Sequence, residues 1–265
     1  MPILHTNGID LYYEIAGDGL PVLLLHGLGS RAEDWAFQLP VLGQHYRVVA
    51  VDLRGHGNSS KPHGPYTVLM MATDVVRLLD SLDIDAVHII GLSMGGMIAF
   101  QLAVDHPERV RSLVIVNSSP ALVARTPGEW LRIRQRLVLA QLFGPARTGR
   151  FLSRRLFPKP EQEFMRAQLI ERWATNDRDA YLASMRAIIG WSVLDRISTI
   201  SCPVLVIAGD RDYLPVDYKQ EYTSRIAGAR LVVIEDSGHA TPIDQADAFN
   251  AWVLEFLSGV DRPHH

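Results

Sequence analysis

A serine set between glycines is the feature of this sequence that points most directly to chemistry. Ser93 lies in the segment Gly-Leu-Ser-Met-Gly-Gly at 91–96, directly after the apolar run 87–90 and directly before an apolar helical pattern. A sharp turn from strand to helix holds a serine hydroxyl exposed, and side chains in place of the flanking glycines would crowd that turn. The helix that begins after Ser93 also points free N–H groups at a developing oxyanion. This setting predicts a nucleophilic serine rather than an idle turn residue.

A serine hydroxyl is a weak nucleophile and needs a base beside it. Of the ten histidines, His239 follows the apolar run 231–234 by a short loop. It therefore stands just past the carboxyl end of a strand, where parallel sheets place their chemistry. His88 lies inside a buried strand pattern, and His26 and His56 fall in glycine-rich loops that they are expected to support. We expect His239 to be the general base.

Two carboxylates compete for the role of orienting that base. The apolar run 204–208 ends in Gly-Asp-Arg-Asp at 209–212, which places Asp210 beside the strand and Asp212 further into the loop. Asp212 can reach back toward His239, whereas Asp210 is placed to pair with its neighbouring arginine or to cap the loop. We expect Asp212 to fix the imidazole tautomer and to stabilise the imidazolium.

A glycine-rich loop is the candidate for binding the oxyanion. The apolar run 21–25 leads into His-Gly-Leu-Gly-Ser at 26–30. The backbone N–H of Leu28 is expected to join that of Met94, so that both donate to a tetrahedral intermediate. Losing one such donor typically raises the barrier by about 2.7–4 kcal/mol.

The elements that must position these residues alternate along most of the chain. Apolar runs without polar alternation predict strands that are covered on both faces, and the helical patterns between them predict a parallel sheet. The expected strands are 21–25, 47–51, 87–90, 113–116, 204–208 and 231–234, and the expected helices are 69–82, 94–104, 217–226 and 245–257. The pair Asn7-Gly8 between two extended segments predicts an antiparallel hairpin at the start of the sheet.

The alternation stops between about 120 and 193, where only helical patterns occur, with breaks at Gly144-Pro145 and at further prolines. We interpret residues 121–193 as a helical cap inserted into an α/β core of 1–120 and 194–260, followed by a tail at 261–265. Residues 121–195 carry thirteen basic and seven acidic side chains, a net +6, which leaves −9 for the rest. This excess indicates either solvated helix faces or a field that steers an anionic substrate.

Substrate choice is expected to lie in the cap and in the acid loop. Trp130, Trp191 and Leu214 are the candidate pocket residues, although each is also of a type that simply holds a cap to a sheet. The expected partner is a small-molecule ester or lactone, and the sequence leaves the oligomeric state open.

Two other classes of function must be weighed. Residues 27–32 also fit G-x-G-x-x-A after a strand, and Asp52 closes the next strand, as in a dinucleotide-binding site. Two observations disfavour an NAD-dependent oxidoreductase. A hairpin precedes this strand, and Pro40 cuts short the helix that the third small residue should pack against. A ligand receptor that keeps a hydrolase-like site but does not turn over is the third class.

Taken together, these motifs resemble those of the α/β-hydrolase superfamily over almost the whole chain, in the order serine, aspartate, histidine. The matching segments are 26–29 (oxyanion loop), 52–59 (D-x-R-G-x-G-x-S loop), 91–96 (nucleophile turn), 209–212 (acid loop) and 238–239 (histidine loop). The pattern is similar to bacterial carboxylesterases and 3-oxoadipate enol-lactonases, while perhydrolases and carbon–carbon bond hydrolases share much of it. Haloalkane dehalogenases carry an aspartate in place of Ser93, so the resemblance disfavours that branch.

Composition narrows the function class further. The 265 residues have a net charge of −3 and one cysteine, which argues against a nucleic-acid footprint and leaves no internal disulfide. No apolar run approaches the roughly 18 residues of a membrane helix, and no secretory leader is visible, so a cytoplasmic protein is expected. No metal-ligand spacing occurs, and no cofactor is expected. The sequence thus predicts a serine hydrolase of carboxylic esters with an acyl-enzyme intermediate, or alternatively an enol-lactone-type lactonase on an anionic substrate.

Overall fold

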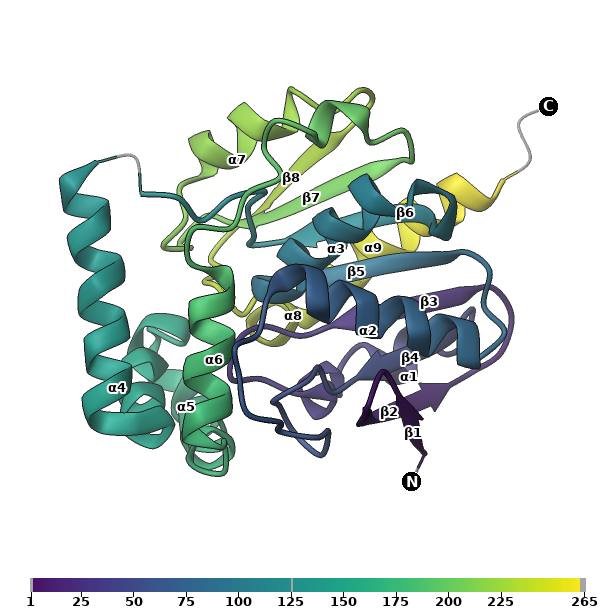
Figure 1. The fold of residues 1–265 in the computed structure, drawn as a ribbon. Coiled ribbons are helices and arrows are strands. Elements are labelled where there is room, and N and C mark those ends of the chain that lie inside the picture. Colours follow the sequence, from purple (N-terminus) through teal and green to yellow (C-terminus); the bar gives the residue numbers. More distant parts are fainter. Residues whose placement is uncertain (1, 125, 263–265) are drawn as a thin grey trace.

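A computed structural model describes residues 2–124 and 126–262, which form one mostly parallel sheet of eight strands in the order β1-β2-β4-β3-β5-β6-β7-β8 (Figure 1). The strands are β1 (Ile3–Thr6), β2 (Ile9–Ala16), β3 (Pro21–Leu25), β4 (Arg47–Val51), β5 (Val87–Leu92), β6 (Val110–Val116), β7 (Val204–Gly209) and β8 (Arg230–Ile234). From β4 to β8 all neighbours are parallel, so the carboxyl ends of these strands meet at one edge.

The hairpin that opens the sheet is confirmed. Asn7 has φ 51° and Gly8 has φ 72°, the left-handed pair that a two-residue turn between antiparallel strands requires. Thr6 pairs with Ile9 across this turn. The strand β2 then pairs antiparallel with β4, so two antiparallel strands border the parallel part of the sheet.

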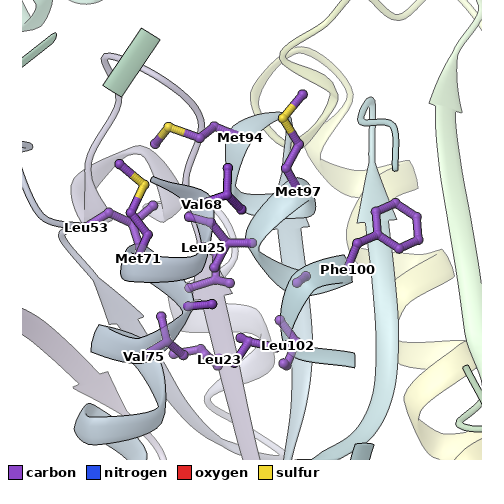
Figure 2. Packing of buried hydrophobic residues seen from close by; sticks show 14 of the residues in the cluster. Leu23, Leu25, Leu53, Val68, Met71, Val75, Met94, Met97, Phe100 and Leu102 are labelled. Carbon is purple, nitrogen blue, oxygen red and sulfur yellow. The ribbon is translucent and has the colours of Figure 1, made fainter. Parts of the chain in front are cut away.

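The two faces of the sheet carry separate apolar cores, and the strand β3 shows why. Leu23 and Leu25 belong to the core under α2 (Val68–Ser81) and α3 (Met94–Asp105), whereas Val22 and Leu24 face the other core. Figure 2 shows the first core, where side chains of β3, α2 and α3 meet. The second face is covered by α1 (Leu39–Leu42) and α9 (Ala246–Asp261). Because every central strand is buried on both faces, its sequence is apolar without alternation.

Three helices are inserted between β6 and β7, and in Figure 1 they gather at one side of the sheet. They are α4 (Pro127–Leu156), α5 (Glu163–Ala174) and α6 (Arg178–Ile188). The helix α4 is kinked at Gly144, which has φ 70° and ψ 178° and precedes Pro145. This arrangement agrees with an inserted helical cap, while its limits as a domain at 121–193 stay a prediction.

Several element limits differ from the sequence prediction. The strand β6 begins three residues early at Val110, and α7 (Val216–Thr223) ends before residue 226. A short helix, α8 (Thr241–Asp244), was not expected. The helix α9 continues to Asp261, so the predicted tail 261–265 begins inside a helix, and its last three residues lie outside the described residues.

Four short 3₁₀ turns complete the described elements: Ala32–Trp35, Pro107–Arg109, Pro160–Gln162 and Ile197–Thr199. Among the helices of residues 2–124 and 126–262, none has the length and apolar character needed to span a bilayer.

Candidate active site

The backbone at Ser93 is strained in the way that a serine between strand and helix requires. Ser93 has φ 53° and ψ −113° and immediately precedes the first residue of α3. A Cβ on Gly91 would lie 2.5 Å from the carbonyl oxygen of Gly95, and one on Gly95 would lie 2.1 Å from that of Leu25. Since real Cβ atoms do not approach so closely, only glycine fits at these positions. The N–H of Ser93 donates to the carbonyl of Val116 at 2.9 Å, which ties the turn to β6.

The loop proposed for the oxyanion hole lies directly against this turn. A Cβ on Gly27 would be 3.4 Å from Cβ of Ser93. Met94 is the first residue of α3, where backbone N–H groups have no partner within the helix, and both Met94 and Leu28 are buried. His26 supports the loop, because its Nε2 accepts from the N–H of Leu53 at 3.0 Å. The two donors predicted from the sequence thus belong to adjoining segments, and their role stays a proposal.

Asp212, not Asp210, makes the contact with the imidazole. An oxygen of Asp212 lies 2.8 Å from Nδ1 of His239, and the Asp212 side chain is fully buried. Asp210 instead accepts from the backbone N–H of Ser237 at 2.9 Å, which holds the histidine loop against the acid loop. The imidazole therefore has its Nδ1–H aimed at a carboxylate, and its Nε2 lies on the side of the ring that faces away from that carboxylate.

A buried lysine accompanies the aspartate, which the sequence reasoning did not anticipate. Nζ of Lys219 lies 2.6 Å from the second oxygen of Asp212, and both side chains have no exposed surface. Burial alone would raise the pKa of Asp212, but the charges and hydrogen bonds of His239 and Lys219 outweigh it and hold that pKa below its usual value. Burial lowers the pKa of Lys219, and Asp212 opposes this. The ion pair keeps the carboxylate ionised in an apolar surrounding.

Asn117, at the end of β6, connects the loops that carry the site. Its side-chain oxygen accepts from Nζ of Lys219 at 2.7 Å and from the N–H of Gly209 at 2.9 Å. Its side-chain nitrogen donates to the carbonyls of Gly238 and His239, each at 3.0 Å. One buried amide thus fixes the ends of three strands relative to one another. Nothing in the sequence around Asn117 distinguishes it from an ordinary turn residue.

A tyrosine hydroxyl lies at the second nitrogen of the imidazole. The hydroxyl of Tyr213 is 2.8 Å from Nε2 of His239, and the two rings are tilted by 30° with centroids 4.2 Å apart. The same hydroxyl lies close to Ser93 and to the Arg136 guanidinium. Although half of the Tyr213 surface is exposed, its hydroxyl end is enclosed, and this burial raises the pKa of the phenol. Tyr213 therefore stands between the serine and the histidine.

Arg136 reaches this point from the cap helix α4. Its guanidinium lies against the hydroxyls of Tyr213 and Tyr181, and Tyr181 comes from α6. Both the Arg136 Nε and the Tyr181 hydroxyl are buried without a hydrogen-bond partner. Neither residue carried a signal in the sequence, because each is one of many of its type and only the folded cap brings it to the serine.

The three pocket residues predicted from the sequence lie in different settings. Trp130 is half exposed on α4, where its ring contacts the guanidinium of Arg134 at 5.0 Å. Trp191 is partly buried, and its Nε1 donates to Gln101 at 2.7 Å. Leu214 is partly buried directly after Tyr213. Their roles in binding substrate stay predictions.

Asp52, the residue that suggested a dinucleotide site, stabilises the loops around it. Asp52 is buried, and its two oxygens accept from the N–H groups of Ala32 and Asn58, both at 2.6 Å. A carboxylate engaged in this way is not available to a ribose hydroxyl. The segment after the glycine loop forms only the short turn Ala32–Trp35 rather than a phosphate-facing helix. Among the described residues, no group of three or more His, Cys, Asp or Glu side chains is arranged to hold a metal ion.

Comparison with known proteins agrees with this architecture. A family model described as "Alpha/beta hydrolase family" matches residues 22–252. The chain is 32% identical to RutD of Azorhizobium caulinodans, a provisionally named carbamate hydrolase, over 99% of this chain and 100% of that protein. It is 31% identical to 3-oxoadipate enol-lactonase 2 of Acinetobacter baylyi, over 94% of this chain and 96% of the relative.

A solved structure extends the likeness to three dimensions. The crystal structure of the enol-lactonase from Burkholderia xenovorans LB400 superposes with a TM-score of 0.90 at 31% identity, covering 97% of this chain and 100% of that chain. The family model and the relatives span nearly the whole sequence, and the mostly parallel sheet agrees with them. The chain therefore belongs to the alpha/beta hydrolase family.

Proposed function

We propose that this protein is a serine hydrolase that cleaves carboxylic esters through Ser93, His239 and Asp212. The observation that carries the proposal is the contact of 2.8 Å between His239 Nδ1 and Asp212. The backbone of Ser93, held at φ 53° between strand and helix, supports it. A carboxylate on Nδ1 leaves Nε2 to take a proton from a nucleophile, and a strained turn presents the nucleophile to it.

In the proposed reaction, Ser93 Oγ attacks the ester carbonyl while Nε2 of His239 takes the serine proton. The resulting oxyanion accepts hydrogen bonds from the backbone N–H groups of Leu28 and Met94. The C–O bond to the alcohol then breaks as His239 returns the proton to the leaving oxygen. A water molecule, deprotonated by His239, attacks the acyl-enzyme, releases the carboxylic acid and restores the serine. Asp212 stabilises the imidazolium at both stages.

A lactone is the second candidate substrate, because it is a cyclic ester that the same three residues can open. The solved enol-lactonase shares the fold at a TM-score of 0.90 and 31% identity, which favours this candidate. Because the RutD relative is named as a carbamate hydrolase, carbamates are a third class of substrate to test.

The experiment compares hydrolysis of 4-nitrophenyl acetate and butyrate by the wild type, Ser93→Ala and Ser258→Ala, with a lactone and a carbamate as further substrates. Ser258 is exposed on α9 and donates only to its own helix, so it is the matched control. We expect Ser93→Ala to lose on the order of 10⁴–10⁶ in turnover and Ser258→Ala to match the wild type. A folded wild type that turns over none of these substrates contradicts the proposal and favours a receptor.

A further inference from the structure

A positive charge without a counter-charge lies at the centre of the candidate site. Arg136 carries a guanidinium at any physiological pH, and its contacts at this point are two neutral phenols, Tyr213 and Tyr181. Among residues 2–124 and 126–262, no carboxylate forms an ion pair with it. Arg136 is partly buried, and charged groups that lose contact with water are ordinarily paired, because an unpaired charge in a low dielectric is costly. An arrangement of this kind is suited to binding an anion.

The hydrogen-bond donors around this charge are also unused. Nε of Arg136 is buried and has no partner, and the hydroxyl of Tyr181, a residue with 1% of its surface exposed, has none either. Buried donors are normally satisfied, and those that are not commonly mark a place where a ligand binds. A planar guanidinium with a free edge matches the two oxygens of a carboxylate.

The position of the charge ties it to the reacting atoms. The Tyr213 hydroxyl lies 2.8 Å from Nε2 of His239, and it also lies close to Arg136 and to Ser93. Arg136 and Ser93 therefore both lie close to the same phenol oxygen. A small molecule attacked by Ser93 is therefore able to reach Arg136 with a second group.

Other arginines of the cap are engaged elsewhere, which makes Arg136 distinct. Arg134, Arg147 and Arg155 lie over exposed aromatic rings of the same helix. Arg172 pairs with Asp34 of the core. These four arginines thus belong to solvated faces or to the contact between cap and core, whereas the contacts of Arg136 lead to the serine.

We propose that Arg136, together with the Tyr181 hydroxyl, binds a carboxylate of the substrate, so that the enzyme acts on esters or lactones that also carry a free carboxylate. The part of this inference that concerns ester cleavage rests on the proposed function, whereas the part that concerns carboxylate binding does not. Binding of the carboxylate displaces the Tyr213 phenol from the guanidinium. Because the same phenol contacts Nε2 of His239, its displacement also opens that nitrogen to Ser93.

The kinetic test uses hemiesters of succinate, glutarate and adipate with 4-nitrophenol, and the methyl esters of the same compounds as neutral partners. Arg136→Gln is compared with Arg134→Gln, which removes the same charge from the exposed face of the same helix. We expect Arg136→Gln to lose on the order of 10- to 100-fold in kcat/KM on the best hemiester, mainly through KM. Its loss on the neutral ester is expected to stay below about threefold, and Arg134→Gln is expected to match the wild type on both.

Arg136→Lys is the second variant, because a lysine keeps the charge but cannot bind a carboxylate with two parallel hydrogen bonds. It is expected to retain part of the preference for the hemiester. Equal losses of Arg136→Gln on charged and neutral esters, or a preference for the hemiester that survives in Arg136→Gln, overturn the inference.

A binding measurement separates this inference from the proposed reaction. Ser93→Ala is titrated with glutarate by calorimetry, alone and combined with Arg136→Gln or with Arg134→Gln. The inference predicts binding that Arg136→Gln abolishes and Arg134→Gln leaves intact. If the wild type hydrolyses no ester but glutarate binds in this Arg136-dependent way, the reaction is wrong and the anion site stands. Glutarate binding that does not depend on Arg136, or no binding at all, overturns the anion site.

Discussion

The Tyr213 hydroxyl lies 2.8 Å from Nε2 of His239, at the nitrogen that a serine nucleophile must reach. The residue directly before it, Asp212, holds the opposite nitrogen of the same ring at 2.8 Å. Two consecutive residues of one loop thus bracket the imidazole. In the proposed reaction this phenol occupies the hydrogen bond that Ser93 needs, so the phenol would have to move before His239 could deprotonate Ser93.

Tyr213→Phe removes the competing hydroxyl and keeps the ring. A neutral hydrogen bond contributes about 0.5–1.5 kcal/mol, so we expect kcat/KM on a neutral 4-nitrophenyl ester to rise by roughly 2- to 10-fold. Tyr46→Phe, which removes a hydroxyl bonded to Asp261 far along the sequence, is the control and is expected to leave the rate unchanged. A fall of about 100-fold in Tyr213→Phe contradicts this account, because it makes the phenol a participant in the chemistry.

Lys219→Met breaks the fully buried ion pair with Asp212 and leaves the carboxylate without its cation. Removing one partner of a buried pair typically costs about 3–5 kcal/mol of unfolding free energy. The exposed pair of Arg230 and Glu255, 3.8 Å apart, is the matched control. Arg230→Met is expected to cost less than about 1 kcal/mol. Urea unfolding at pH 7 measures both, and similar losses in the two variants contradict the role assigned to Lys219.

The same pair sets a pH dependence at the acid end. The folded protein holds the pKa of Asp212 below its usual value, so its stabilising contribution is complete above the unfolded pKa of about 3.9. This contribution is lost as pH falls through the lower folded pKa. Lys219→Met removes one cation that lowers this pKa, so acid unfolding monitored by circular dichroism is expected at a higher pH in the variant. If the pH midpoint of acid unfolding is the same in Lys219→Met and the wild type, Lys219 does not lower the pKa of Asp212 as described.

A second pH dependence arises at His56, which is buried with its Nδ1 bonded to the carbonyl of Arg54 at 3.0 Å. Burial, and after it the neighbouring His26, lower the pKa of His56 to about 3. Below about pH 6.5, His56 is therefore protonated in the unfolded chain but stays neutral in the folded chain. The free energy of unfolding falls as the pH decreases from about 6.5 to about 3. At pH 4.5 this costs on the order of 3 kcal/mol.

His56→Asn keeps a donor for the Arg54 carbonyl but cannot be protonated. We expect this variant to be less stable than the wild type at pH 7 by about 1 kcal/mol and to close or reverse that difference at pH 4.5. Urea midpoints at the two pH values measure the change. His63→Asn, at an exposed position, is the control. A difference between His56→Asn and the wild type that is the same at both pH values contradicts the assignment.

The fold and the residues proposed for chemistry were predictable because their signals are local. Ser93 is marked by glycines that only a crowded turn requires, and the structure shows the approach of 2.1 Å that a Cβ on Gly95 would make. His239 and Asp212 follow buried strands, so the topology of a parallel sheet alone brings them to one edge. Asp212 was favoured over Asp210 by its place in the loop, and the contact of 2.8 Å with the imidazole agrees.

The polar groups around these residues were not predictable, because their partners come from distant parts of the chain. Asn117 reads as an ordinary turn residue until the ends of three strands converge on it. Lys219 did leave a weak signal, since it lies three and four residues before the buried Tyr222 and Thr223 on the same face of α7. Arg136 is one of twelve arginines in residues 121–195, and only the packing of the cap against the serine distinguishes it.

The central claim, a nucleophilic Ser93 activated by His239, is tested most directly by covalent labelling with a fluorophosphonate, followed by intact-mass and peptide mass spectrometry. The account predicts one adduct per chain, located on Ser93, absent in Ser93→Ala and formed on the order of 10³-fold or more slowly in His239→Ala. An adduct on another residue, an unlabelled but folded wild type, or equal labelling rates in the wild type and His239→Ala would contradict it.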